Sequence, residues 1–285
     1  MSAKIEELFN ISGKVVAITG AGGVLYGTIS KALAANGAKV ALLDIAGDRV
    51  AELAAEIKAA GGDAVGIECS VLDADSIGAA LDKIVAEFGT CDVLINGAGG
   101  NQKAATVQPD GKFTDLSTDA LDKVFALNYN GTVLPTQAFC KLFAERGAGI
   151  VINTTSMCAL APLTNVVGYS NAKAAVTNFT RWLAVQVKVD FPDADIRVNE
   201  IAPGFLVTTQ NQSLLYEDDG ETLTRRAHSI IDNTPMGRFG EPGELVGPIM
   251  LLMSDAGSFL HGVTVPIDGG FNIYSGVGPL DEKKG

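Results

Sequence analysis

Three side chains that can hold or move a proton lie close together in the sequence: Ser156, Tyr169 and Lys173. Tyr169 and Lys173 are four residues apart, which places them on one helix face with Cβ atoms about 5–6 Å apart. A neighbouring ammonium favours the phenolate and lowers the phenol pKa from its usual value of about 10. Since acid–base catalysis needs a pKa near the working pH, this cluster predicts proton transfer at a substrate oxygen. The alternative is an exposed helix with an unrelated Tyr and Lys.

A glycine-rich segment from Thr19 to Gly27 follows a short β-branched run and precedes a helical pattern. Glycines there permit a tight turn, and a pyrophosphate can then rest on the helix N-terminus. Asp44 ends the next apolar run, 24 residues after Gly20. A carboxylate at that place accepts hydrogen bonds from the adenosine ribose and repels a 2′-phosphate, which predicts NAD rather than NADP. The alternative is an aspartate that caps the following helix.

Seven short apolar and β-branched runs predict strands, at residues 15–19, 39–44, 64–69, 92–96, 149–154, 196–201 and 258–267. Helical patterns lie between them, at residues 28–36, 49–60, 75–88, 119–146, 168–189 and 242–254. Strands that alternate with helices of this kind are typical of βαβ units. The sequence therefore predicts a single doubly wound α/β Rossmann domain, with a seven-stranded parallel sheet and helices on both faces.

The chain of 285 residues contains no linker and no repeat, so we expect one NAD-binding catalytic domain over residues 1–285. The least regular segment, residues 204–240, is polar and follows the sixth strand. Because it leaves the carboxyl edge of the sheet, it is predicted to form a lid over the substrate. The end of the chain, residues 276–285, is expected to be an exposed tail.

Composition excludes several other classes of protein. The net charge is −12 and no basic stripe occurs, which argues against nucleic acid and anionic membranes as partners. There is no run of eighteen apolar residues and no signal-peptide pattern at the N-terminus. The four cysteines form no Cys-x-x-Cys pair and only two histidines occur, so no metal site is expected. Free thiols indicate a cytoplasmic protein.

Further motifs complete a recognisable order. Asn96-Gly-Ala-Gly, Asn128, Pro203-Gly204 and Asp268-Gly-Gly join the Thr19-Gly turn, Asp44, Ser156 and Tyr169-x-x-x-Lys173. Over about residues 9–270, this order resembles the short-chain dehydrogenase/reductase family. The resemblance implies that Tyr169 donates or accepts the proton, and that Lys173 lowers its pKa and binds the nicotinamide ribose. It also implies that Ser156 holds the substrate oxygen and that Asn128 positions a water in a proton relay.

The resemblance implies an NAD site that draws on most of the strand ends. The implied cofactor-binding residues are Gly20, Gly23, Val24, Leu25, Asp44, Ile45, Ser70, Val71, Asn96, Gly97, Ala98, Gly99, Tyr169, Lys173, Pro203, Gly204 and Leu206. Two features depart from the family pattern. Val24 and Tyr26 stand at the second and third glycine places of the turn, and Ser70 stands where an acidic residue often lies near the adenine.

Within the family, segments such as 96–101, 179–184 and 234–240 resemble the D-mannonate oxidoreductase (fructuronate reductase) branch. This resemblance implies an anionic hexonate substrate and a homotetramer, formed through the two long helices after the fourth and fifth strands and through the last strand. The implied substrate contacts are Asn101, Ser156, Met157, Tyr169, Gln210 and Asn211, with Lys103, Arg225 and Arg226 as candidate partners of a carboxylate. Open alternatives are a gluconate or sorbitol dehydrogenase, an epimerase or dehydratase on the same fold, and a non-catalytic nucleotide-binding protein.

Overall fold

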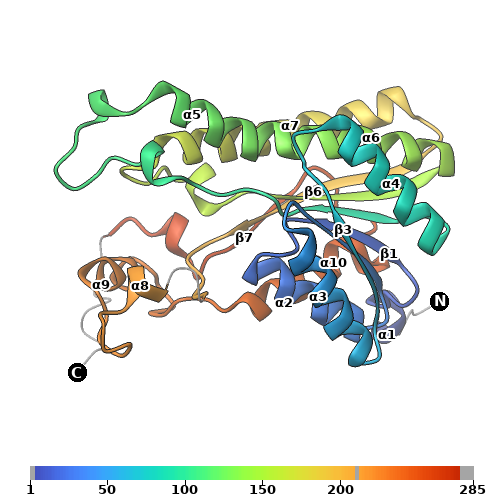
Figure 1. Ribbon diagram of the computed structural model, residues 1–285, viewed down its shortest axis with the longest axis horizontal. Helices are drawn as coiled ribbons and strands as arrows, with labels where there is room; N and C mark the ends of the chain where they lie inside the picture. The colour runs from blue at the N-terminus through green and yellow to red at the C-terminus, as the bar shows by residue number, and fades with distance from the viewer. Residues whose placement is uncertain (1–3, 209–211, 277–285) are drawn as a thin grey trace.

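Seven strands form one parallel sheet at the centre of the protein (Figure 1). We describe residues 4–208 and 212–276 from a computed structural model. The strands are β1 (Val15–Thr19), β2 (Lys39–Asp44), β3 (Asp63–Glu68), β4 (Val93–Asn96), β5 (Ala148–Thr154), β6 (Asp195–Pro203) and β7 (Thr264–Ile267). Their order in the sheet is β3-β2-β1-β4-β5-β6-β7. The order reverses between β1 and β4, so a crevice opens beyond the carboxyl ends of these two strands, where α/β proteins bind ligands.

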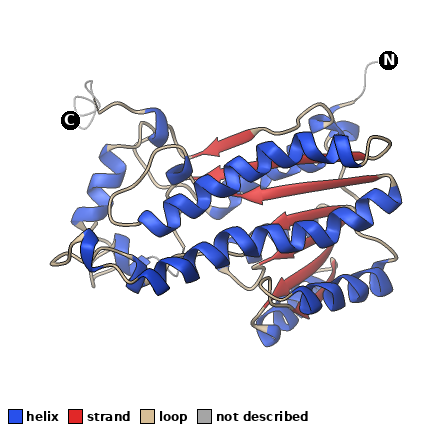
Figure 2. Ribbon diagram, turned by 90° about the horizontal axis from the view of Figure 1, so that it is seen from above, coloured by secondary structure: helices blue, strands red, loops and turns tan. Residues whose placement is uncertain are grey.

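Helices cover both faces of the sheet (Figures 1 and 2). One face carries α2 (Val24–Ala35), α3 (Gly47–Ala59) and α10 (Val246–Met253); the other carries α4 (Ala74–Phe88), α5 (Thr118–Phe125), α6 (Gly131–Arg146) and α7 (Val167–Asp190). The short helix α1 (Ile5–Leu8) precedes β1, and α8 (Gln212–Leu215) and α9 (Arg225–Asp232) lie between β6 and α10. The predicted doubly wound α/β fold is confirmed.

Two apolar layers, one on each face, hold the sheet between the helices. Side chains of β1 alternate between them: Val16 and Ile18 belong to the layer under α2, α3 and α10, whereas Val15 and Ala17 belong to the layer under α4, α6 and α7. All five β1 residues are buried. This two-sided burial explains why the strands appear in the sequence as continuous apolar runs rather than as alternating patterns.

Several elements differ in their bounds from the sequence-based expectation, and three of these differences have a clear local cause. Helix α2 begins at Val24 and not at residue 28, because the glycine-rich turn ends at Gly23, which occupies the N-cap. The long stretch predicted at residues 119–146 is interrupted by a π-helical turn, Ala126–Asn130, between α5 and α6. The last strand begins at Thr264 and not at residue 258, since the preceding residues form a 3-10 turn, Asp255–Gly257, and a loop.

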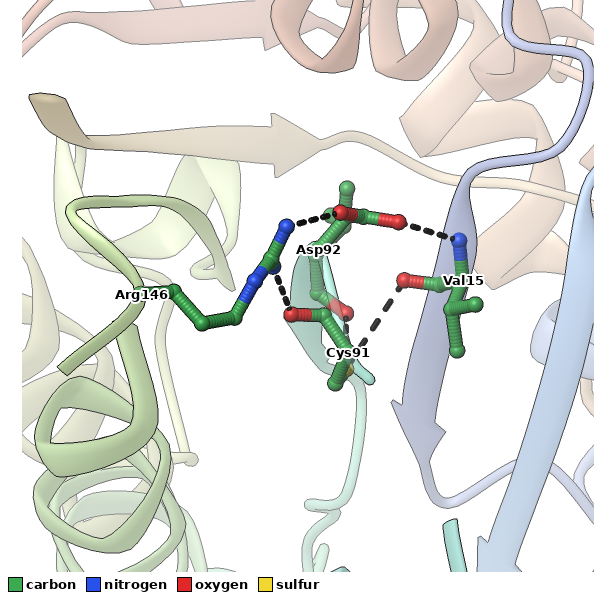
Figure 3. Close-up of polar contacts among 5 residues, drawn as sticks. Val15, Cys91, Asp92 and Arg146 are labelled. Carbon is green, nitrogen blue, oxygen red and sulfur yellow. Dashed lines mark hydrogen bonds and ion pairs between the residues drawn. The ribbon is translucent and has the colours of Figure 1, made fainter. Parts of the chain in front are cut away.

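The amino edge of the sheet is closed by a polar cluster (Figure 3). Arg146, the last residue of α6, donates to the Cys91 carbonyl and pairs with Asp92 Oδ1 at 2.6 Å. The other oxygen of Asp92 accepts from the Val15 amide at 2.7 Å. A cation at a helix C-terminus is also favoured by the helix dipole. This cluster ties α6 to the starts of β1 and β4, at the edge of the sheet remote from the crevice.

The contact between α3 and β3 gives a stability test. A Cβ on Gly66 would meet the Val50 carbonyl and lie 2.7 Å from the Ala51 amide nitrogen, both backbone groups of α3. Because backbone cannot move aside as a side-chain tip can, we expect Gly66→Ala to lower the free energy of unfolding by about 1–3 kcal/mol in urea denaturation. The matched control is Gly78→Ala inside α4, where a Cβ meets nothing within 4 Å. That substitution should add about 0.5–1 kcal/mol. Equal stability of the two variants would contradict the packing described here.

Candidate active site

The three proton-handling residues predicted from the sequence meet at the carboxyl edge of the sheet. Ser156 follows β5, and Tyr169 and Lys173 lie in the first two turns of α7. The Ser156 hydroxyl lies close enough to the Tyr169 phenol to lower its pKa. Lys173 is 3% exposed, and its Nζ lies 5.6 Å from the centroid of the Tyr169 ring. The same Nζ donates to the Thr154 carbonyl at 2.9 Å. The cluster can therefore present a phenol and a hydroxyl to one substrate oxygen.

Burial controls the protonation of this cluster. Desolvation raises the pKa of Tyr169 above its usual range, and the nearby Ser156 hydroxyl only partly opposes this rise. Desolvation lowers the pKa of Lys173 to about 8, against the raising effects of Cys158 and Glu200. Lys173 is not among the groups that shift the Tyr169 pKa in the chain by itself, so its implied effect on that pKa stays a prediction. Its ammonium is engaged by the Thr154 carbonyl.

Asn128 lies within the π-helical turn that interrupts the long helix, and it is fully buried. Its Oδ1 accepts from the Gly100 amide at 3.1 Å, and its Nδ2 donates to the Gly100 carbonyl at 2.7 Å. A Cβ on Gly99 would lie 2.6 Å from Asn128 Oδ1 and 3.1 Å from Lys173 Nζ. Asn128 thus holds the turn after β4 close to Lys173. Its amide is used for this contact, and its implied role with a water stays a prediction.

The glycine-rich turn suits a dinucleotide phosphate. Gly20 has φ +70°, and a Cβ there would lie 2.8 Å from the Ala98 backbone, so the two turns after β1 and β4 touch directly. Helix α2 has no side-chain cap at Gly23 and no acidic residue in its first turn. An uncapped helix N-terminus of this kind favours an anion. The Thr19 hydroxyl accepts from the Gly97 and Ala98 amides at 3.1 and 3.2 Å, which fixes the spacing of the two turns.

The predicted adenosine side of the site lies at the ends of β2 and β3. Asp44 Oδ2 accepts from the Gly22 amide at 3.0 Å, so this carboxylate also holds the glycine-rich turn. Ile45 is 74% exposed next to it, and Ser70 is half-buried after β3. Val71 is buried and touches the position where a Cβ on Gly131 would lie. An exposed apolar side chain beside a carboxylate fits a flat base attached to a ribose.

Two residues of this region point into the protein. Asn96 is buried, and its Nδ2 donates to Thr136 Oγ1 at 2.9 Å and to Asn153 Oδ1 at 2.8 Å. Its side chain therefore links the end of β4 to α6 and β5 and does not face the crevice. Tyr26, at a glycine place of the family pattern, is 3% exposed and its hydroxyl is hydrogen-bonded to Thr154. The absence of a side chain on Gly97 makes room for the Tyr26 ring.

The remaining predicted residues spread along the crevice. Gly204 packs against Asp268, where a Cβ would lie 2.6 Å from the Asp268 Cα, so two motifs distant in sequence meet. Leu206 lies 8% exposed on a pocket of about 500 Å³ that is also lined by Met236. Among the predicted substrate contacts, Met157 is buried and Asn101 is exposed, and the candidate cations Lys103, Arg225 and Arg226 are exposed. Gln210 and Asn211 lie outside the described residues.

Comparison with known proteins agrees with this geometry. A family model described as enoyl-(acyl carrier protein) reductase matches residues 27–272. An oxidoreductase of Haemophilus influenzae, whose name gives no substrate, is 46% identical over 279 residues, 94% of this chain and 96% of that protein. The chain belongs to the short-chain dehydrogenase/reductase family. The D-threitol dehydrogenase of Mycolicibacterium smegmatis is 32% identical over 265 residues, 93% of this chain and 95% of that protein.

A solved structure superposes closely on this short-chain dehydrogenase/reductase. A Haemophilus influenzae protein provisionally named D-mannonate oxidoreductase, solved with bound NAD, superposes with a TM-score of 0.87. It is 45% identical, and the match covers 94% of this chain and 98% of that one. None of the helices in the described part of the chain combines the length and apolar content needed to span a membrane. Within residues 4–208 and 212–276, no group of three His, Cys, Asp or Glu side chains could hold a metal ion.

Two residues that shape the site of this family member are not predicted from its sequence. Thr154 holds Lys173 through its main-chain carbonyl. The sequence did offer a sign of this role, since Thr154 is a small polar residue at the carboxyl end of a strand, two positions before Ser156. Glu200 in β6 is fully buried and accepts from the Thr264 hydroxyl at 2.6 Å. Nothing in the sequence marks Glu200, since its burial results from the packing of α7 onto β6.

The burial of the Glu200 carboxyl leads us to expect that the stability of the protein depends on pH. Burial raises the pKa of this carboxyl above the usual value, although the hydrogen bond from Thr264, the nearby hydroxyls of Thr180 and Thr177 and the charge of Arg181 act in the opposite direction. A carboxyl whose folded pKa is raised ionises first in the unfolded chain, so stability falls as pH rises above about 4.3 towards the folded pKa. We therefore expect Glu200→Gln to be more stable than the wild type at pH 7 and to lose that advantage at pH 4.

Urea denaturation at the two pH values measures this difference. The matched control is Glu87→Gln, because Glu87 is exposed on α4. Its stability relative to the wild type should not change with pH. An equal advantage of Glu200→Gln at both pH values would show that the buried carboxyl is not the cause.

Proposed function

We propose that this short-chain dehydrogenase/reductase transfers a hydride between NAD(H) and a secondary alcohol or ketone of a sugar acid, with D-mannonate and D-fructuronate as the substrate pair. The observation that carries the proposal is the convergence of Ser156, Tyr169 and Lys173 beside the turns after β1 and β4. The bound NAD in the similar Haemophilus influenzae structure supports the cofactor. The provisional name of that protein supports the substrate.

NAD supplies the hydride acceptor in this proposal. The glycine-rich turn and the N-terminus of α2 would hold its pyrophosphate, and Asp44 its adenosine ribose. Tyr169 would take the proton of the substrate hydroxyl during oxidation and return it during reduction. Ser156 would hold the same oxygen through its hydroxyl, and the Lys173 ammonium would stabilise negative charge that develops there.

The segment from residue 204 to 240 is proposed to select the substrate, within a single catalytic domain over residues 1–285. Helices α8 and α9 lie in it, and a separate apolar cluster that includes Leu215, Ile230 and Phe239 holds them together. A unit with its own small core can move against the sheet as a body, as substrate lids do. Exposed Arg225 and Arg226 on α9 stay candidate partners for a substrate carboxylate.

Assembly and location are part of the proposal. Trp182 and Val185 of α7 are 55% and 67% exposed, and apolar side chains of this size on a long helix suit an interface in a homotetramer. All four cysteines are free thiols, which supports a reducing compartment such as the cytoplasm. Gel filtration with light scattering would test the tetramer.

A polyol dehydrogenase is the second candidate, because D-threitol dehydrogenase is 32% identical over nearly the whole chain. A panel of hexonates, ketohexuronates and polyols, assayed with NAD and NADH by nicotinamide absorbance, separates the two. D-Mannonate with NAD should give the highest kcat/KM. A polyol in first place would replace the sugar acid, and product formation without net NADH would indicate an epimerase or dehydratase.

Removal of one oxygen atom tests the role of Tyr169. In Tyr169→Phe the ring remains and the proton-transfer group is lost, so kcat should fall by about 10²–10⁴-fold, the usual contribution of general acid–base catalysis. NADH binding, measured by fluorescence titration, should change little, because the glycine-rich turn and Asp44 are untouched. Turnover close to the wild-type rate would exclude Tyr169 as the proton donor or acceptor.

Asp44 should decide between the two nicotinamide cofactors. Asp44→Asn keeps one side-chain oxygen, which can still accept from the Gly22 or the Ala46 amide, and removes the charge that repels a 2′-phosphate. We expect the preference for NAD over NADP, measured as a ratio of kcat/KM values, to fall by at least about tenfold, since a hydrogen bond to a charged group contributes roughly 1.5–3 kcal/mol. The control is Asp48→Asn, at an exposed position in the first turn of α3. An unchanged ratio in Asp44→Asn would contradict this assignment.

A further inference from the structure

Tyr26 fills a place where the family pattern has a glycine, and it joins three parts of the site. It belongs to the first turn of α2 and is 3% exposed. Its ring lies against the turn after β4, where a Cβ on Gly97 would be 2.5 Å from two ring carbons. Its hydroxyl reaches the end of β5 and is hydrogen-bonded to the Thr154 hydroxyl. One side chain therefore spans from the glycine-rich turn to the strand that precedes Ser156.

Thr154 connects Tyr26 to Lys173. Its side chain is hydrogen-bonded to Tyr26, and its main-chain carbonyl accepts from Lys173 Nζ at 2.9 Å. Thr154 is 7% exposed, so both bonds are shielded from water. A hydrogen bond in such surroundings is stronger than in water, and its loss leaves a buried polar group unsatisfied.

We propose that Tyr26 is a positioning residue: its hydrogen bond to the Thr154 hydroxyl fixes the Thr154 carbonyl that holds the Lys173 ammonium. The effect on turnover rests on the proposed function, whereas the link between Tyr26 and Lys173 does not. Tyr26 itself stays neutral, because burial raises its pKa above the usual range despite the opposing bond to Thr154. The ionisable groups that act on Lys173 or contact it are Tyr169, Cys158 and Glu200.

The chain offers substitutions that isolate this bond. Tyr26→Phe removes one oxygen and keeps the ring that packs on Gly97. Thr154→Val removes the partner hydroxyl at nearly constant shape, and Thr154→Ser keeps that hydroxyl. The matched control is Tyr216→Phe, since Tyr216 packs with the separate cluster around α8 and α9.

Urea denaturation without cofactor tests the link in the free protein. Tyr26→Phe is made in the wild type and in Lys173→Met, where no ammonium needs the Thr154 carbonyl. If the two sites are coupled through Thr154, the loss in urea midpoint caused by Tyr26→Phe is smaller in Lys173→Met than in the wild type, because sites that share a partner are not additive. Tyr216→Phe should cause the same loss in both backgrounds. Equal losses for Tyr26→Phe would overturn the proposal.

Kinetics tests the consequence for the reaction. We expect Tyr26→Phe to lower kcat about three- to tenfold, the effect of one buried hydrogen bond, with the NADH dissociation constant changed by less than about twofold. Thr154→Val should match it, Thr154→Ser should restore most of kcat, and the double variant Tyr26→Phe/Thr154→Val should be no slower than either single variant. A wild-type kcat in Tyr26→Phe, or multiplicative losses in the double variant, would overturn the proposal. A wild type without turnover would refute the proposed function and leave the urea experiment to decide the link.

Discussion

The hydrogen bond from Lys173 to the Thr154 carbonyl is the contact on which the arrangement of the site depends. Thr154 is the last residue of β5, where the regular ladder with β6 ends. An isolated ammonium could not be buried to 3% exposure, because transfer of a charge out of water costs several kcal/mol. The strand-end carbonyl offsets part of that cost and fixes the direction of the side chain. Tyr169 lies one turn earlier on α7, with its ring centroid 5.6 Å from the Lys173 Nζ.

Close contacts between backbone segments bring the other parts to this point. Gly20 touches the turn after β4, Gly99 leaves room for Asn128 and Lys173, and Gly204 packs on Asp268. At each position a Cβ would lie under 3.0 Å from a neighbouring group. The crevice is therefore assembled from turns in direct contact. The absence of side chains at these glycines sets the distances between the glycine-rich turn after β1, the side chains of Tyr169 and Lys173, and the sheet. At Gly97, the space that a side chain would occupy is filled by the ring of Tyr26 from α2.

Local sequence determines much of this fold, and tertiary packing determines the rest. β1 and β2 begin and end where their apolar runs do, since a strand buried on both faces has a continuous pattern. The start of β7 could not be found in the same way. The Asn199 side chain donates to the Leu260 carbonyl and accepts from the Val263 amide, and the Gly262 amide donates to the Val198 carbonyl. The apolar residues before Thr264 are therefore held in a loop and do not extend the strand. The spacing of Tyr169 and Lys173 correctly placed them together, but the direction of their pKa shifts depends on burial, which only the packed structure reveals.

Burial favours the neutral form of both Tyr169 and Lys173. It raises the phenol pKa and brings the Lys173 pKa to about 8, so at neutral pH the chain by itself holds a protonated phenol beside a protonated amine. A protonated phenol can donate to a carbonyl oxygen, which is the step that reduction requires under the proposed function. Oxidation under the proposed function needs the phenolate, which burial disfavours. The oxidised nicotinamide of NAD carries a positive charge, which favours a phenolate nearby. Under the proposed function, the protonation state of Tyr169 and the redox state of the cofactor would be coupled by electrostatics, in the direction that the reaction requires.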